Sequence, residues 1–162
     1  DSHERCSVVE VMGRNAGHLA LRTAIGVGAL AVIVPEREND LDVVIEKIKE
    51  TQRMGKKHFI VVVAEGVGGV EEMAKKIEEK TGIETRATIL GHVQRGGNPT
   101  VRDRVMATGM GYRAVELLEQ GIGNRVVGLK NNEIYDVDIQ EALAMKKPFD
   151  DYLYDILYKT AF

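Results

Sequence analysis

The 162-residue sequence has little of what marks several large protein classes. Its only cysteine is Cys6, so an internal disulfide is impossible and a reducing, cytoplasmic compartment is the location we expect. No apolar run approaches the roughly 20 residues of a membrane-spanning helix, and we find no secretory leader pattern. With a formal net charge of -3, we do not expect a nucleic-acid footprint over the whole surface. These absences argue against a disulfide-stabilised domain, a membrane protein and a general nucleic-acid binder.

The composition is that of an ordinary globular protein. Hydrophobic residues make up 44% and charged residues 29%, which is enough to bury a sizeable core at this length. We expect a single α/β domain over residues 1–162, in which residues 131–162 form a less regular carboxyl-terminal extension packed on the rest. The sequence opens with DSHER, without a methionine, and reaches a strand-like run at Cys6. We therefore expect the chain to be part of a longer protein.

Strand-like and helix-like patterns alternate along the chain. Short runs rich in β-branched residues predict strands at 6–12, 31–35, 58–64, 86–90 and 125–129. Apolar residues at helical spacing predict one helix beginning near Leu41, after a capping Asn39 or Asp40, and another beginning near Val70. The repetition of strand, helix and strand predicts a three-layer α/β/α sandwich with a mostly parallel, Rossmann-like sheet.

A third helix is predicted from Pro99 to about Glu119, with Asn98 as its capping residue. Because apolar or small residues lie almost all around this helix, we expect it to be deeply buried. After residue 130 the pattern predicts a turn, a short helix and a surface helix, at 131–132, 139–144 and 152–158.

Charged residues follow three of the predicted strands. Arg14 follows the first strand, Glu65 the third, and His92 and Arg95 the fourth. The carboxyl ends of parallel strands lie at one edge of a sheet, where ligands bind in α/β folds, so we expect these side chains to gather there. Arginine and histidine suit a phosphate, while a carboxylate accepts hydrogen bonds from hydroxyls. The set predicts a site for a phosphorylated polyol or sugar; the alternative is that each residue is structural.

Two further stretches carry weaker signals. EGVGGVEE, at 65–72, offers Gly66 and Gly68 of a dinucleotide-binding glycine pattern, but Glu71 stands at the third glycine position. GKKH, at 55–58, is either a solvated helix end or a basic pocket for an anion. Cys6 itself is expected to be a small buried strand residue.

The same residues give the sequence a resemblance to a known family. VEVMGRNAGHLAL (9–21), AEG (64–66) and TRATILGHVQRGGNPTVRDRV (85–105) resemble the carboxyl-terminal half of bacterial-type, ATP-dependent 6-phosphofructokinases. The resemblance covers essentially the whole chain. It implies transfer of the γ-phosphate of ATP to the 1-hydroxyl of fructose 6-phosphate in glycolysis. It also implies a homo-oligomer, a tetramer in this family.

The resemblance implies roles for individual residues as well. Arg14 would stand between the two substrates and stabilise the phosphoryl group in transfer, and Glu65 would accept a hydrogen bond from a sugar hydroxyl. Arg5 and Arg86 would reach the sugar phosphate of a neighbouring subunit. That role agrees with their place at the amino ends of predicted strands, away from the edge that carries Arg14. The implied substrate-binding set is Arg5, Met12, Gly13, Arg14, Glu65, Arg86, His92 and Arg95.

Three stretches of the family's other half, GGDSPGMN, GGDGS and TIDND, do not occur in the sequence. In the family they carry the nucleotide phosphates, the magnesium and the aspartate that acts as base. ATP and Mg²⁺ are therefore expected to bind mainly outside this chain, which should contain no metal site. The chain alone is expected to hold part of a sugar-phosphate site and to lack catalysis.

The effector pocket of bacterial family members is matched only in part, by Lys56 and Lys57. Leu30 and Met54 stand where the family has a glutamate and an arginine. We expect effector control to be weak or absent, and Leu30→Glu with Met54→Arg to strengthen effector binding. Three alternatives stay open: a pyrophosphate-dependent family member, a non-catalytic sugar-phosphate-binding regulatory module, and a dinucleotide-binding domain.

Overall fold

The computed structural model describes residues 4–38 and 40–161, which form two compact units. The first unit runs to Arg95 and takes in the segment from Phe149 onward, and the second runs from Gly96 to Pro148. The sequence suggests one domain, in which residues 131–162 form a less regular extension. Among the described residues, no helix combines the length and the apolar character needed to cross a bilayer.

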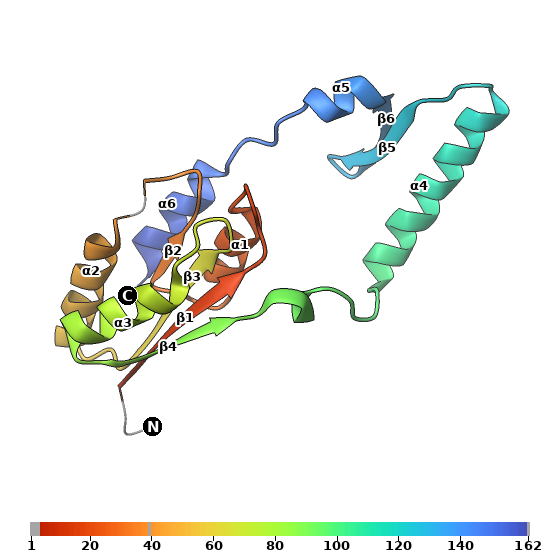
Figure 1. Ribbon diagram of the computed structural model, residues 1–162. Helices are drawn as coiled ribbons and strands as arrows, with labels where there is room; N and C mark the ends of the chain where they lie inside the picture. The colour runs from red at the N-terminus through yellow and green to blue at the C-terminus, as the bar shows by residue number, and fades with distance from the viewer. Residues whose placement is uncertain (1–3, 39, 162) are drawn as a thin grey trace. The chain divides into compact units, whose positions relative to one another are not determined.

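A four-stranded parallel sheet forms the centre of the first unit (Figure 1). In register, Val8 lies between Val61 and Ala87 of the neighbouring strands. Residues 61–64 are all buried, as expected of a strand covered on both faces. The spatial order is β2-β3-β1-β4, and the strands are β1 (Arg5–Val11), β2 (Ala31–Ile33), β3 (His58–Ala64) and β4 (Glu84–Ile89).

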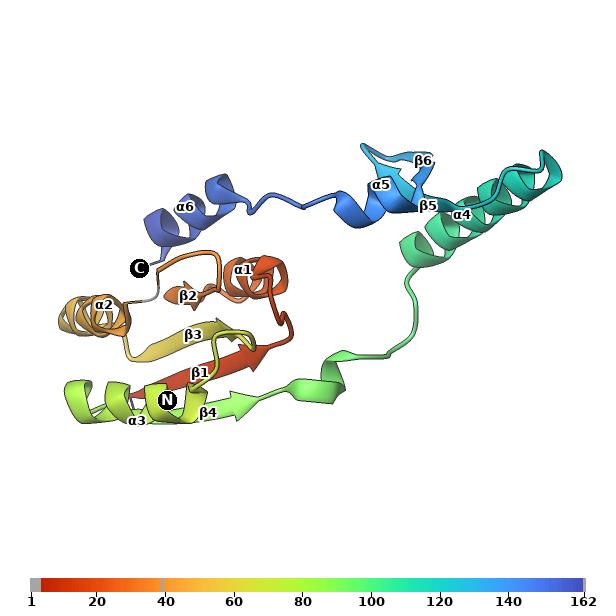
Figure 2. The same cartoon turned by 45° about the horizontal axis from the view of Figure 1, so that its top comes forward.

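Helices cover both faces of this sheet (Figure 2). One buried cluster joins the sheet to α2 and α3, through Ile45 and Ile77 among others. The other joins it to α1 and α6, through Leu21 and Leu157. The helices are α1 (His18–Gly26), α2 (Leu41–Arg53), α3 (Val70–Thr81) and α6 (Asp151–Thr160). The predicted three-layer α/β/α sandwich with a parallel, Rossmann-like sheet is confirmed.

Several element boundaries differ from the sequence expectation. β1 begins one residue early, at Arg5, and β4 begins two residues before Arg86, at Glu84. α2 begins at Leu41 as predicted, because the carboxylate of Asp40 caps it by accepting a hydrogen bond from Asp42 N (2.9 Å). Asn39, the other candidate cap, lies outside the described residues.

The last helix packs with one face against the sandwich. Leu157 of α6 is 2% exposed, and the Tyr158 hydroxyl donates a hydrogen bond to the carbonyl oxygen of Val32 (3.2 Å). The ammonium of Lys47 lies 4.7 Å from the centre of the Tyr158 ring. Burial raises the pKa of the Tyr158 hydroxyl. The predicted surface helix at 152–158 is therefore present, and one face of α6 belongs to the sandwich.

The second unit consists of a long helix, a β-hairpin and a short helix. The hairpin turns at Asn131 and Asn132, whose positive φ angles (53° and 67°) suit a type I′ turn, so the predicted turn is confirmed. The strand near 125–129 pairs antiparallel within this hairpin, so its expected place in the parallel sheet is wrong. The elements are α4 (Val101–Glu119), β5 (Arg125–Lys130), β6 (Glu133–Asp138) and α5 (Ile139–Ala144).

α4 begins later than predicted and is not deeply buried. Thr100 caps it in a capping box, in which Asp103 N donates to Thr100 Oγ1 (3.3 Å) and Thr100 N donates to Asp103 Oδ2 (2.8 Å). This reciprocal pair satisfies the helix end, so the start at Pro99 is wrong and the end at Glu119 is confirmed. Only Leu117 of α4 is buried, because the hairpin covers a small part of the helix.

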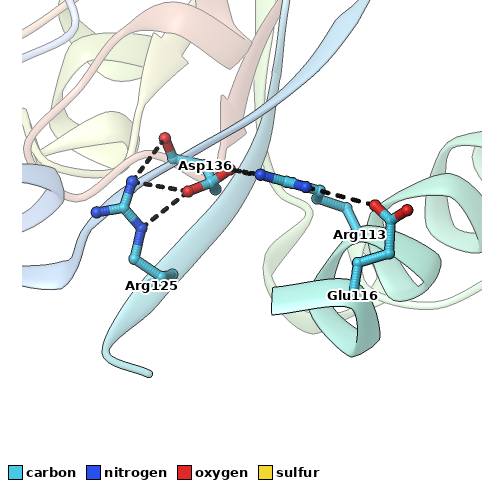
Figure 3. Close-up of polar contacts among 4 residues, drawn as sticks. All are labelled: Arg113, Glu116, Arg125 and Asp136. Atoms are coloured by element: carbon cyan, nitrogen blue, oxygen red, sulfur yellow. Dashed lines mark hydrogen bonds and ion pairs between the residues drawn. The ribbon is translucent and has the colours of Figure 1, made fainter. Parts of the chain in front are cut away.

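A network of charged side chains joins α4 to the hairpin (Figure 3). Asp136 accepts hydrogen bonds from Arg113 of α4 (2.8 Å from Nη2) and from Arg125 of β5 (2.8 Å from Nε). Arg113 also contacts Glu116 (3.4 Å). The hydrogen bonds from Arg113 and then Arg125 lower the pKa of Asp136. Because every charge in the network is paired, we assign it a structural role within the second unit.

Candidate functional site

Three strands of the first unit end together at one edge of the sheet. In register, Val11 of β1 lies opposite Ala64 of β3, and Glu10 of β1 lies opposite Ile89 of β4. The segments that follow these strands therefore meet at the carboxyl edge. They carry six of the predicted site residues, as the sequence suggests: Met12, Gly13, Arg14, Glu65, His92 and Arg95.

Hydrogen bonds join these segments to one another. Gly66 N donates to the carbonyl oxygen of Gly13 (3.4 Å), which links the ends of β3 and β1. Met12 N donates to Oε1 of Gln94 (3.1 Å) in the 3-10 helix η1 (Gly91–Gln94), which links β1 to the segment after β4. Gln94 is a residue that the sequence analysis missed, because an uncharged amide between His92 and Arg95 carries no separate signal.

Two glycines at this edge permit close approach of the backbone. A β-carbon at Gly66 would overlap the carbonyl oxygen of Arg14, and one at Gly13 would overlap that of Ala16. Gly13 also has a positive φ of 144°, which residues other than glycine rarely adopt. These glycines therefore hold the loop that carries Arg14 against the end of β3.

The charged side chains at the edge are exposed and unpaired. Within residues 4–38 and 40–161, the side chains of Arg14, His92 and Arg95 make no hydrogen bond and no ion pair. Surface arginines commonly find a carboxylate, as Arg113 and Arg125 do in the second unit. The N–H donors of Arg14, His92 and Arg95 are therefore available to an anion.

Two carboxylates lie at the same edge. Glu65 is half-buried. Burial of Glu10 raises the pKa of its carboxyl group, and the nearby negative charge of Glu65 raises it further. Glu10 is the second residue that the sequence analysis missed, because it sits inside a strand-like run and resembles an ordinary surface position. The edge thus combines cationic donors with carboxylate acceptors, which suits a ligand that carries both a phosphate and hydroxyls.

Arg5 and Arg86 lie near the opposite end of the sheet. Arg5 is the first residue of β1 and lies opposite Glu84, while Arg86 lies opposite Ser7. Both arginines contact the same carboxylate: Arg86 Nη2 lies 2.6 Å from Glu84 Oε1, and Arg5 Nε lies 3.5 Å from Glu84 Oε2. The expectation that Arg86 begins its strand is wrong by two residues, but its side chain is directed toward the amino end.

The candidate effector residues differ in their surroundings. Lys56 is half-buried and Lys57 exposed, at the end of α2. Burial and then the charge of Lys56 lower the pKa of the neighbouring Lys47. Leu30 is fully buried in the core, whereas Met54 is 67% exposed. Leu30 therefore packs against the sheet instead of facing solvent, and GKKH follows the end of α2.

The glycine-rich stretch after β3 is followed by acidic residues that do not suit a pyrophosphate group. Gly68 and Gly69 form a turn with positive φ angles (72° and 67°), and α3 starts directly after it. Glu71 and Glu72 occupy the first turn of α3. Their carboxylates already complement the positive end of the helix and would repel a phosphate, so this loop argues against a dinucleotide site.

The remaining predicted features concern Cys6 and metals. Cys6 is 1% exposed, and burial raises its pKa to about 11, so the thiol is a small core group as predicted. In the described part of the chain, no three side chains of His, Cys, Asp or Glu are grouped so as to hold a metal ion. Glu10 and Glu65 form only a pair of carboxylates.

Comparisons with known proteins show which proteins this chain resembles. A family model described as phosphofructokinase matches residues 1–118. An ATP-dependent 6-phosphofructokinase from Clostridium botulinum (strain Loch Maree / Type A3) is 58% identical over 155 residues, which cover 96% of this chain and 49% of that protein. ATP-dependent 6-phosphofructokinase 1 from Clostridium perfringens (strain 13 / Type A) is 57% identical with the same coverage. The chain spans about half the length of the curated relatives it matches.

Solved structures show the same likeness. The phosphofructokinase from Saccharomyces cerevisiae superposes with a TM-score of 0.80 and 33% identity, covering 88% of this chain and 20% of that chain. A pyrophosphate-dependent phosphofructokinase from Marinobacter aquaeolei has a TM-score of 0.76 over 97% of this chain and 48% of that chain. Its identity of 18% supports the shared fold alone.

Proposed function

The chain belongs to the phosphofructokinase family, and from this premise we propose that it supplies the sugar-phosphate-binding half of an ATP-dependent 6-phosphofructokinase. The full-length enzyme would transfer the γ-phosphate of ATP to the 1-hydroxyl of fructose 6-phosphate and form fructose 1,6-bisphosphate. The observation that carries this proposal is the group of three unpaired donors at the carboxyl edge, on Arg14, His92 and Arg95.

Different residues at the edge bind different parts of the ligand. Arg95 and His92 hold the 6-phosphate or the adjoining sugar atoms, because a guanidinium matches phosphate oxygens in pairs. Glu65 accepts a hydrogen bond from a sugar hydroxyl, and Met12 and Gly13 line the sugar from the loop after β1. This division uses both the cationic and the acidic groups of the edge.

Arg14 has the role closest to the reaction. Its guanidinium would stabilise the charge on the phosphoryl group during transfer, since catalysis of phosphoryl transfer rests mainly on positioning and on neutralising charge. The nucleotide, the magnesium ion and the base that accepts the proton of the 1-hydroxyl belong to the other half of the enzyme. The isolated chain is accordingly proposed to bind substrate without turnover.

Arg5 and Arg86 are proposed to complete the sugar-phosphate site of a neighbouring subunit. Six steps along β1 separate Arg5 from Val11, or about 20 Å at the usual rise of a strand, which exceeds the reach of an arginine side chain. Both arginines are exposed, by 55% and 70% of their side chains. The full-length enzyme is therefore proposed to be a homo-oligomer, a tetramer, with shared active sites.

ATP is the proposed phosphoryl donor. The curated relatives at 57–58% identity are named ATP-dependent, whereas the pyrophosphate-dependent structures share only 18–21% identity with this chain. The free, buried thiol of Cys6 is consistent with the reducing cytoplasm that we propose as the location.

Replacing Arg95 tests the proposal. In the full-length protein, Arg95→Ala should raise the KM for fructose 6-phosphate about ten- to a hundredfold, because a hydrogen bond to a charged group contributes about 1.5–3 kcal/mol. Arg22→Ala, which removes an exposed arginine on α1, is the matched control and should leave the KM unchanged. An Arg95→Ala enzyme with the wild-type KM would show that Arg95 has no part in sugar-phosphate binding.

A further inference from the structure

The loop that carries Arg14 connects β1 to α1 and has an unusual junction with the helix. Gly17 is the residue before α1 and has no side chain to cap it, and no acidic residue lies in the first turn. The first N–H groups of a helix need acceptors from elsewhere. The amino end of α1, three residues beyond Arg14, therefore depends on another part of the chain.

Glu36 supplies that acceptor from the segment after β2. Gly17 N donates to both carboxylate oxygens of Glu36, at 2.8 Å to Oε1 and 3.0 Å to Oε2. Gly17 is buried, and a β-carbon there would overlap the side chain of Val34 and crowd the Glu36 carboxylate. The contact joins residues 19 positions apart and fixes the far end of the Arg14 loop.

Gln94 fixes the near end of the same loop. Its Oε1 accepts a hydrogen bond from Met12 N (3.1 Å), and its Nε2 donates to the carbonyl oxygen of Gly91 (3.3 Å). Gln94 thereby ties the start of the loop to the turn that carries His92. The loop is held at both ends by side chains that make bonds to its backbone and none to Arg14.

We propose that Glu36 and Gln94 are positioning residues for Arg14, and that they hold the 12–17 loop at its two ends. The proposal rests on the role given to Arg14 under the proposed function. The Arg14 side chain is exposed and makes no bond within the described residues, so only its backbone fixes its place before substrate binds. A displacement of about 1 Å in a catalytic group can lower the rate about a hundredfold.

Glu36 can be compared with a helix cap that has no link to the site. Asp40 caps α2 from the same β2–α2 connection, accepting from Asp42 N at 2.9 Å. In the full-length protein, Glu36→Ala and Asp40→Ala should lower the melting temperature by similar amounts, since each removes an acceptor at a helix end. Only Glu36→Ala should lower kcat, by about tenfold or more, with the KM for fructose 6-phosphate changed less than about twofold.

Three further variants complete the test. Glu36→Gln retains an oxygen acceptor for Gly17 N and should recover most of the turnover. Gln94→Ala should lower kcat and also raise the KM, because Gln94 holds the segment of His92 as well. If Glu36→Ala does not fold, Glu36→Asp, whose carboxylate is one methylene shorter, provides the same comparison with Asp40→Ala.

The outcomes separate this inference from the proposed function. A Glu36 variant with the kcat of Asp40→Ala, beside an Arg14→Ala variant with strongly reduced kcat, would overturn the positioning role alone. An Arg14→Ala variant with normal kcat would overturn the role of Arg14 in the proposed function, and the positioning role with it. Reduced kcat in Glu36→Ala and Arg14→Ala but not in Asp40→Ala is the result we expect.

Discussion

Two defective subunits of the full-length enzyme should restore each other's activity. Arg14 lies at the carboxyl edge, whereas Arg86 contacts Glu84 near the amino end of the same sheet. One chain therefore cannot place both arginines in one site. Under the proposed function, a complete site combines Arg14 of one subunit with Arg86 of another. An Arg14→Ala subunit and an Arg86→Ala subunit each lack a different half of this pair.

The structure gives the expected size of each defect. The side chain of Arg86 is 70% exposed, so loss of its pair with Glu84 should cost about 0–1 kcal/mol of stability and leave the fold intact. Loss of the bond that we propose between Arg86 and the sugar phosphate should raise the KM for fructose 6-phosphate about ten- to a hundredfold. Arg14→Ala should instead lower kcat, on the order of 100–1000-fold, because its contact strengthens in the transition state.

Co-expression of the two variants in equal amounts provides the assay, with fructose 6-phosphate well below the wild-type KM. Random pairing makes about a quarter of the sites complete, so the mixture should show about a quarter of the wild-type activity while each parent stays far lower. The matched control mixes Arg14→Ala with the double variant Arg14→Ala, Arg86→Ala, which yields no complete site. A mixture no more active than the mean of its parents would refute the shared site.

Two other predictions follow from the same edge. The isolated 162-residue chain should show no turnover of fructose 6-phosphate with ATP in a coupled assay, and turnover above that of an Arg14→Ala chain would contradict the assignment of the base to the other half. Gly66→Ala should lower the free energy of unfolding by about 1–3 kcal/mol, measured by urea titration, because its β-carbon overlaps the carbonyl oxygen of Arg14. Gly26→Ala, with open space around the new methyl group, is the control and should not destabilise; equal effects would remove the packing argument.

Sequence patterns predicted the parts of this fold that depend on local chemistry. The nearly continuous apolar run of HFIVVVA matches the bounds of β3, because a strand covered on both faces needs mostly apolar side chains. The Asn131-Asn132 pair predicted its turn, since asparagine tolerates positive φ. The carboxyl edge was predictable for the same kind of reason, because parallel strands all end on one side.

The parts that sequence did not predict depend on contacts between distant residues. The sequence does not predict α1, because only Ala20, Leu21 and Ala24 of its nine residues are buried and the helical spacing of apolar residues is therefore weak. β6 alternates poorly, since EIYDVD mixes charged and apolar residues in a hairpin that α4 covers only partly. Glu36 and Gln94 act through bonds to the backbone of the Arg14 loop, and no spacing rule connects residue 36 or 94 with residues 12–17.

The burial of Leu30 argues against an effector role for a carboxylate at this position. The sequence suggests that Leu30→Glu with Met54→Arg strengthens effector binding, but Leu30 has no exposed surface and packs in the core beside β2. A carboxylate at that position would lose its hydration without gaining a partner, at a cost of several kcal/mol, against a total stability of about 5–15 kcal/mol for an ordinary protein. Leu30→Glu should therefore lower the melting temperature sharply and fail to increase ADP binding, whereas Met54→Arg, at a position 67% exposed, should leave the melting temperature nearly unchanged. Thermal unfolding and ADP titration of the two single variants provide the measurements. A Leu30→Glu protein with the wild-type melting temperature and tighter ADP binding would mean that this side chain faces a pocket, and would restore the effector interpretation.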